Sequence, residues 1–169
     1  MRIAATIVTN DTTGKLVEAV KSVSGWIDGI VLLSTLGEDK HPTNYAAEME
    51  VFDGYFHVIQ HPRITGETLY QTRNEALQAA SDLGYDWGMV LDYDERMILR
   101  HTREELEQWL AKSYEVLLVQ ALGGGYAKDR LFRLPVTSGS FGGTRAHEAF
   151  SPNSFESERK RVNLPGRCV

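Results

Sequence analysis

Short apolar runs of the kind found in buried strands alternate along the chain with segments in which apolar residues recur at helical spacing. The predicted strands cover residues 3–8, 30–33, 55–59, 87–91, 114–122 and 131–134. The predicted helices cover residues 16–23, 44–52, 65–83 and 102–110, and Thr65 and Thr102 are expected to cap the last two. This alternation indicates an α/β fold with a mostly parallel central sheet flanked by helices.

The C-terminal third departs from this alternation. The loop that contains Gly123-Gly124-Gly125 is too short for a crossover helix, so the strands on either side of it should be antiparallel. We therefore expect a small mixed or antiparallel part near the C-terminus. Residues 1–150 should form one domain. Residues 151–169 are polar and show no periodicity, which predicts an irregular tail with at most a short helix at 154–161.

Composition narrows the classes of function. The chain has 169 residues, of which 42% are hydrophobic, and no apolar run approaches the ~20 residues of a membrane-spanning helix. A formal net charge of -5 argues against general binding to nucleic acid. Cys168 is the single cysteine, so the chain can form neither an internal disulfide nor a cysteine-based zinc site. We expect a cytoplasmic protein.

An acidic loop, Asp92-Tyr93-Asp94-Glu95, follows the predicted strand 87–91 directly. Ligands of open α/β sheets bind beyond the carboxyl ends of the strands. If the chain continues extended, Asp92 and Asp94 project to one side and Tyr93 to the other. Two carboxylates on one side suit a divalent cation that also binds phosphate oxygens. The alternative is that both residues only cap turns.

Further blocks of sequence lie before and after this loop. Residues 72–77 (TRNEAL) precede it, and residues 130–133 (RLFR) and 141–148 (FGGTRAHE) follow it. Together with residues 91–95 (LDYDE), they resemble the "RN-x-A-L … W-x-x-x-L-D-x-D-E" and "R-x-F-R … G-x-x-H-E" patterns of glycosyltransferase family 2. The likeness covers residues 1–150. It implies a GT-A, Rossmann-like fold, a nucleotide-sugar donor, a divalent metal ion and inversion at the anomeric carbon.

The resemblance also implies roles for individual residues. Asp94 would bind the metal ion directly, and Asp92 would lie near the metal ion or the ribose. Arg73 would support the donor site from its helix, although a surface salt bridge explains this arginine equally well. The other residues expected at the nucleotide-sugar site are Thr9, Asn10, Asp11, Asp39, Tyr93, Arg130 and Arg145.

Arginines of the downstream blocks are candidates for binding the diphosphate, because a guanidinium can bind phosphate oxygens with two hydrogen bonds. Alternation along a strand places Arg130 and Phe132 on one face and Arg133 on the other. Arg130 and Arg133 are therefore not expected to act together.

His147 and Glu148 are expected on a loop. The resemblance implies that His147 completes the metal site with Asp94 and Asp92, and that Glu148 is the catalytic base that deprotonates the acceptor. Asp94, as the metal ligand, would be the other catalytic residue. The alternative is a solvated histidine and an ordinary surface glutamate.

We therefore expect a metal-dependent, inverting hexosyltransferase that uses Mn²⁺ or Mg²⁺ to move a sugar from a nucleotide-sugar donor, a UDP-hexose, to a hydroxyl group. The acceptor is an unidentified glycan, lipid or protein. Few residues follow His147-Glu148. The acceptor side would therefore be minimal, open to a large acceptor, or supplied by a partner subunit in a homo-oligomer.

Other functions remain open. A sugar nucleotidyltransferase would carry a glycine-rich, basic loop after the first strand, and residues 9–15 (TNDTTGK) do not match that pattern. A receiver-like signalling module would leave His147-Glu148 unexplained. A degenerate transferase that binds nucleotide without turnover is the third alternative.

Overall fold

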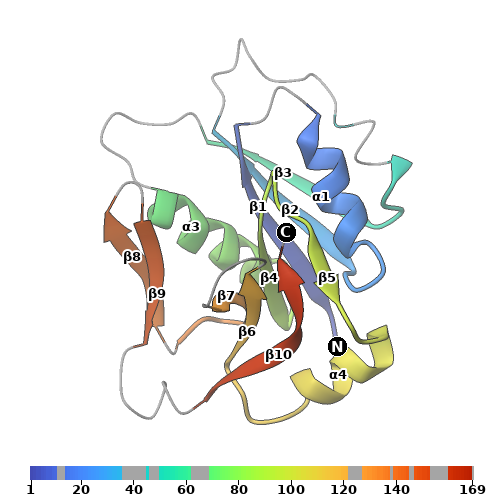
Figure 1. The fold of residues 1–169 in the computed structure, drawn as a ribbon. Coiled ribbons are helices and arrows are strands. Elements are labelled where there is room, and N and C mark those ends of the chain that lie inside the picture. The colour runs from blue at the N-terminus through green and yellow to red at the C-terminus, as the bar shows by residue number, and fades with distance from the viewer. Residues whose placement is uncertain are drawn as a thin grey trace.

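The computed structural model describes residues 1–10, 14–35, 45, 50–61, 69–121, 127–137, 139–144, 147–152 and 160–168 (Figure 1). Only the backbone is described for residues 69, 121, 143–144, 147–149, 161 and 165–168. Asp11, Asp39, Arg145, the predicted cap Thr65, the glycines of residues 123–125 and most of the predicted helix 44–52 lie outside the described residues.

The secondary structure follows the predicted alternation of strands and helices over most of the chain. The strands are β1 (Ile3–Thr9), β2 (Gly29–Ser34), β3 (Tyr55–Gln60), β4 (Trp87–Asp92), β5 (Met97–Leu99), β6 (Val116–Ala121), β7 (Ala127–Arg133), β8 (Gly139–Thr144), β9 (His147–Pro152) and β10 (Arg161–Cys168). The helices are α1 (Lys15–Val23), α3 (Leu69–Asp82) and α4 (Arg103–Leu110).

Eight of the described strands form one sheet in the order β3-β2-β1-β4-β7-β6-β10-β5. The half from β3 to β4 is parallel throughout. Strand β7 is antiparallel to both of its neighbours, β4 and β6, which confirms the antiparallel relation predicted for the last two apolar strands. The mixed part of the sheet therefore begins next to β4, the strand that ends in the acidic loop.

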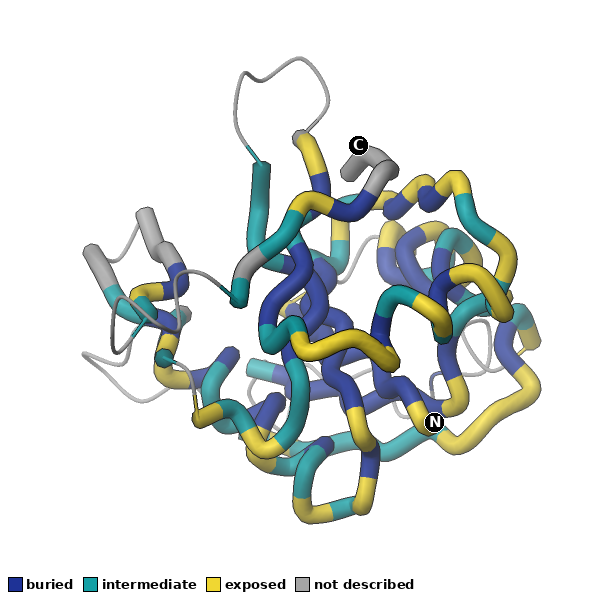
Figure 2. Tube along the Cα trace, turned by 90° about the horizontal axis from the view of Figure 1, so that it is seen from below, coloured by how far each residue is buried: buried dark blue, intermediate teal, exposed yellow. Residues whose placement is uncertain are grey.

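Helices cover both faces of the parallel half. Ile3, Ala5 and Ile7 of β1 pack in one cluster with residues of α1 and α4. Ala4, on the opposite face of the same strand, packs with Ala80 of α3. The buried residues concentrate in these central strands, as Figure 2 shows. Helix α3 therefore lies on the face of the sheet opposite α1.

Local signals explain the ends of the helices. Thr102 accepts a hydrogen bond from the backbone of Glu105, and the Glu105 side chain accepts one from the Thr102 backbone, so the predicted capping box is confirmed. Helix α3 ends at Asp82, and Gly84, two residues later, has a φ of 77°, a left-handed conformation that glycine adopts without strain. The backbone N–H of Tyr85 donates to the carbonyl of Ala80, which completes a Schellman-type C-cap.

The prediction of an irregular C-terminal tail is wrong for residues 161–168. Strand β10 lies inside the sheet, parallel to β6 and antiparallel to β5, and the buried side chain of Leu164 joins the main core. Strand β9 likewise extends two residues beyond Phe150. Pairing with neighbouring strands orders these segments, although their local sequence shows no periodicity.

Strands β8 and β9 form a separate two-stranded sheet, here called the β8–β9 hairpin (residues 139–144 and 147–152), which lies beside α3 (Figure 1). Its side chains Phe141 and Phe150 pack on Phe132 of β7, with ring centroids 5.2 and 4.9 Å away. No helix within the described residues is long and apolar enough to cross a membrane.

Candidate functional site

The candidate site lies at the carboxyl ends of the central parallel strands. In the register of the sheet, Val8 of β1 is opposite Asp92 of β4, and Thr9 is opposite Ser34 of β2. Thr9 and Asn10 therefore lie at the same edge of the sheet as the acidic loop, as their positions at strand ends predict. Thr9 is buried, and its carbonyl accepts hydrogen bonds from the backbone and hydroxyl of Thr35 at 2.9 and 3.2 Å.

The acidic loop is a tight turn, so the expectation of an extended chain through Asp92 and Asp94 is wrong. Strand β4 ends at Asp92, and the backbone N–H of Glu95 donates to the Asp92 carbonyl at 3.0 Å. Tyr93 packs against the main core. The turn gives Asp92 and Asp94 different surroundings, because Asp92 is half-buried and Asp94 is exposed.

Two buried arginines bind the Asp92 carboxylate. Arg73, on the buried face of α3, donates to one carboxylate oxygen of Asp92. Arg130, on β7, donates to the other oxygen at 3.2 Å. The sequence alone is equally consistent with a surface salt bridge for Arg73. In the structure, however, the Arg73 side chain is only 7% exposed. Both oxygens of Asp92 are therefore fixed by charged hydrogen bonds from two elements.

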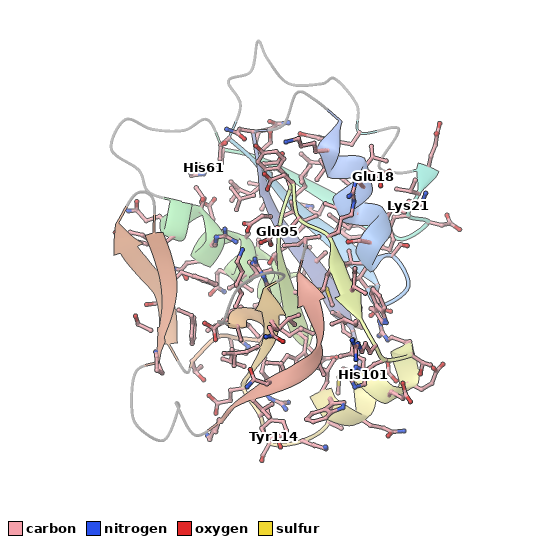
Figure 3. All side chains as sticks on the ribbon, viewed as in Figure 1. Glu18, Lys21, His61, Glu95, His101 and Tyr114 are labelled. Carbon is pink, nitrogen blue, oxygen red and sulfur yellow. The ribbon has the colours of Figure 1, made fainter. Side chains whose placement is uncertain are left out.

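Glu95 and Lys128 complete this group of charges; the sequence places Glu95 in the acidic loop without assigning it a role, and it does not single out Lys128. Arg130 donates to one carboxylate oxygen of Glu95, and the Lys128 ammonium donates to the other. The Lys128 nitrogen also lies 3.9 Å from Asp92. We call these five residues, Arg73, Asp92, Glu95, Lys128 and Arg130, the charged cluster; Glu95 is labelled in Figure 3.

The direction of β7 explains why its cations reach the acidic loop. Because β7 is antiparallel to β4, its first residues lie beside the carboxyl end of β4 and its last residue, Arg133, pairs with Trp87 at the opposite end. The pairing of β7 with β6 is irregular between Asp129 and Leu131, and the side chains of Lys128 and Arg130 both reach Glu95. Arg133 donates to the carbonyls of Leu110 and Tyr114, each at 3.0 Å. The prediction that Arg130 and Arg133 act separately is confirmed.

The charge of Asp92 is fixed by its neighbours. Burial raises the pKa of a carboxyl group, but the guanidinium groups of Arg73 and Arg130 outweigh that effect and hold the pKa of Asp92 well below its ordinary value. Asp92 is therefore ionised throughout the physiological range. Within the charged cluster three cations face two carboxylates, so an excess of one positive charge remains.

The expected metal ligands fit a divalent cation only in part. The exposed carboxylate of Asp94 forms no ion pair with any described residue and has oxygens available for a hard cation. Asp92 already accepts from two guanidinium groups, so it fits the orienting role better than that of a direct ligand. His147 and Glu148 belong to β9 rather than to a loop, and their side chains lie outside the described part.

Comparison with known proteins adds to this geometry. No protein-family model matches the chain, and no curated protein matches it. Among solved structures, S. aureus TarS matches 79% of this chain at 13% identity, with TM-scores of 0.53 for residues 1–349 and 0.56 for a longer chain. TarS is a glycosyltransferase with a GT-A-like fold. This chain has a GT-A-like fold.

The likeness is one of fold rather than of sequence. A structure of TarS in complex with UDP-GlcNAc matches 75% of this chain at 14% identity, with a TM-score of 0.51. The chain spans 47% of TarS 1–349, 28% of the longer TarS chain and 36% of the chain in complex with UDP-GlcNAc. It therefore covers less than half of each of these structures.

Proposed function

We propose that this chain is a glycosyltransferase that uses a UDP-sugar donor bound at the charged cluster. One observation carries the proposal: at the carboxyl end of β4, in a GT-A-like fold, Asp92 is held by two buried arginines beside an exposed Asp94. The crystal structures of TarS with UDP and with UDP-GlcNAc, which share this fold, support a UDP-sugar as the donor.

The excess positive charge of the cluster suits a diphosphate. Lys128 is the most accessible of its cations, with 32% of its side chain exposed against 7% for Arg73 and 4% for Arg130. A bound diphosphate would take Lys128 as a partner, while the two arginines keep Asp92 in place. Thr9, Asn10 and Tyr93, at the same edge, would contact the nucleoside, and Asp11, Asp39 and Arg145 remain expected at the donor.

A divalent cation, Mn²⁺ or Mg²⁺, would be bound by Asp94 and His147, with Asp92 next to them. When bound, it neutralises the charge that builds up on the diphosphate as the bond to the sugar breaks. The ionised state of Asp92 and the exposure of Asp94 support this assignment.

The reaction would be a single displacement. The acceptor hydroxyl oxygen forms a bond to the anomeric carbon, the bond from that carbon to the diphosphate oxygen breaks, and UDP leaves with the electron pair. Glu148 would take the proton of the hydroxyl group, and the configuration at the anomeric carbon inverts. The identity of the hexose follows from the donor that the protein accepts.

Mass spectrometry of donor turnover tests the proposal. The protein is incubated with UDP-, GDP- and other nucleotide sugars, with and without Mn²⁺, and release of the nucleoside diphosphate is followed. We expect release from a UDP-sugar, with UDP-GlcNAc first among those tested, and at least ~10-fold faster release with metal. Binding without release would favour the degenerate transferase. Formation of a nucleotide sugar from a sugar phosphate would favour the nucleotidyltransferase. If the protein neither binds nor converts any of these nucleotides, then the transferase, the degenerate transferase and the nucleotidyltransferase are all contradicted.

A further inference from the structure

The β8–β9 hairpin depends on contacts with the rest of the protein for its position. Within the described residues it is a two-stranded sheet that shares no strand pairing with the eight-stranded sheet. An isolated two-stranded hairpin is marginally stable in water, so docking must fix it. Part of the docking is apolar, through Phe141 and Phe150 on Phe132. Apolar contact is not directional, so by itself it defines the position of the hairpin along α3 only weakly.

Asn74 of α3 supplies a directional contact. Its side-chain amide donates to the carbonyl of Phe141 at 3.1 Å, and its side-chain oxygen accepts from the backbone N–H of Phe141 at 3.0 Å. In an antiparallel pair, the N–H and C=O of alternate residues point away from the partner strand. Asn74 therefore binds the outer edge of β8 as a neighbouring strand would. These two hydrogen bonds fix one position of β8 relative to α3.

The residue before Asn74 is Arg73, which binds Asp92. Two consecutive residues of α3 thus join the acidic loop and the hairpin. In the hairpin, the register places Thr144 opposite His147 and Gly143 opposite Glu148, so both expected active-site residues lie on the strand paired with β8. The guanidinium of Arg73 also lies 5.7 Å from the centre of the Phe141 ring.

We propose that Asn74 is a positioning residue that sets the β8–β9 hairpin, and with it His147 and Glu148, relative to the Asp92–Asp94 loop. This inference rests on the proposed function for the part that concerns turnover. Its structural part, the dependence of the hairpin on the Asn74 amide, does not. Of these two neighbouring residues of α3, Arg73 orients the acidic loop and Asn74 orients the hairpin.

The test compares Asn74→Leu, which keeps the size of the side chain and removes both hydrogen bonds, with Asn74→Asp, which keeps the acceptor and removes the donor. Gln78→Leu is the control, since Gln78 lies one turn further along α3, is exposed and bonds only Asp82 in the described contacts. Amide hydrogen exchange at Phe141 is one measurement. Release of UDP from UDP-GlcNAc to water, compared with the Kd for UDP measured without metal, is the other.

For Asn74→Leu we expect exchange at Phe141 to be at least ~10-fold faster, with β1 and β4 unchanged. We expect kcat to fall at least ~10-fold, and by more than the affinity for UDP measured without metal, because displacement of the hairpin moves the expected metal ligand and base away from the reacting groups. Asn74→Asp should retain part of the protection at Phe141, and Gln78→Leu should match wild type in all respects.

Unchanged exchange at Phe141 in Asn74→Leu overturns the proposal, whether or not the protein transfers sugar. Faster exchange with unchanged kcat overturns it too, because Asn74 would then have a structural role alone. A parallel loss of kcat and of UDP affinity assigns the effect to a disturbed Arg73 and also overturns it. Failure of the proposed function is seen separately, as absence of UDP binding by the wild-type protein.

Discussion

At the scale of single residues, Asp92 is the carboxylate that both buried arginines of the candidate site bind. Its carboxylate has the lowered pKa of a group held by two guanidinium groups, and Arg130 in turn bonds Glu95. The pair Arg130–Asp92 is buried on the arginine side, so removal of the carboxylate would leave a buried cation with one partner fewer. Asp92 is thus expected to stabilise the fold as well as to orient the donor.

The substitution Asp92→Asn tests the stabilising role through pH. The pKa of Asp92 is lower in the folded protein than its ordinary value of 3.8, so the stabilisation is present above pH ~4 and is lost as the pH falls further. We expect the variant to be about 1–3 kcal/mol less stable than wild type at pH 7, in urea unfolding. The difference should shrink below pH ~4.

The exposed Asp53 provides the matched control, because Asp53→Asn removes a carboxylate that no described residue pairs with. It should leave the unfolding free energy within ~0.5 kcal/mol of wild type across the same range. A destabilisation by Asp92→Asn that does not change with pH would contradict the assigned ion pairs.

The sequence predicts part of the charged cluster. Asp92 and Arg73 are found where the motif and the strand end place them. Lys128 was missed because the predicted strand began at Leu131, whereas β7 begins at Ala127. Alternation along the strand would not have placed Lys128 either, because the pairing of β7 with β6 is irregular between Asp129 and Leu131. Glu95 was visible in the sequence, but its partners depend on the antiparallel pairing of β4 with β7, which residue spacing does not reveal.

At the scale of elements, the parallel strands were predictable and β10 was not. Strands β1, β2 and β4 are buried on both faces and read as continuous apolar runs. Strand β10 has one described buried side chain, Leu164, followed by Pro165-Gly166 at an irregularity in its pairing with β6. Proline and glycine are typical of such irregular positions and interrupt the alternation that a prediction would use.

The position of β10 between β6 and β5 makes a quantitative prediction. Leu164 is 2% exposed, so Leu164→Ala should lower the unfolding free energy by about 2–5 kcal/mol. Ile98, on the adjacent strand β5, is 53% exposed, and Ile98→Ala should change it by less than about 0.5 kcal/mol. Equal, small effects of both substitutions in urea unfolding would show that β10 does not belong to the folded core.

At the scale of the whole molecule, the fold brings separate parts of the chain to one edge of the sheet. The carboxyl ends of β1 and β4, the start of β7 and the buried face of α3 meet there, and the β8–β9 hairpin packs on the same helix. The GT-A-like fold, shared with S. aureus TarS at low identity, accounts for this arrangement without fixing the substrate. The donor must be identified by binding.

Calorimetric titration of UDP into the wild-type protein, with and without Mn²⁺, tests the central claim most directly. We predict binding that Mn²⁺ strengthens at least ~10-fold. In Asp94→Ala this strengthening should disappear, while the Tm stays that of wild type because Asp94 is exposed. If UDP and other nucleoside diphosphates give no binding in either condition, the charged cluster is not a nucleotide-sugar site. If Asp94→Ala binds UDP as wild type does, with the same response to Mn²⁺, then Asp94 is not the metal ligand.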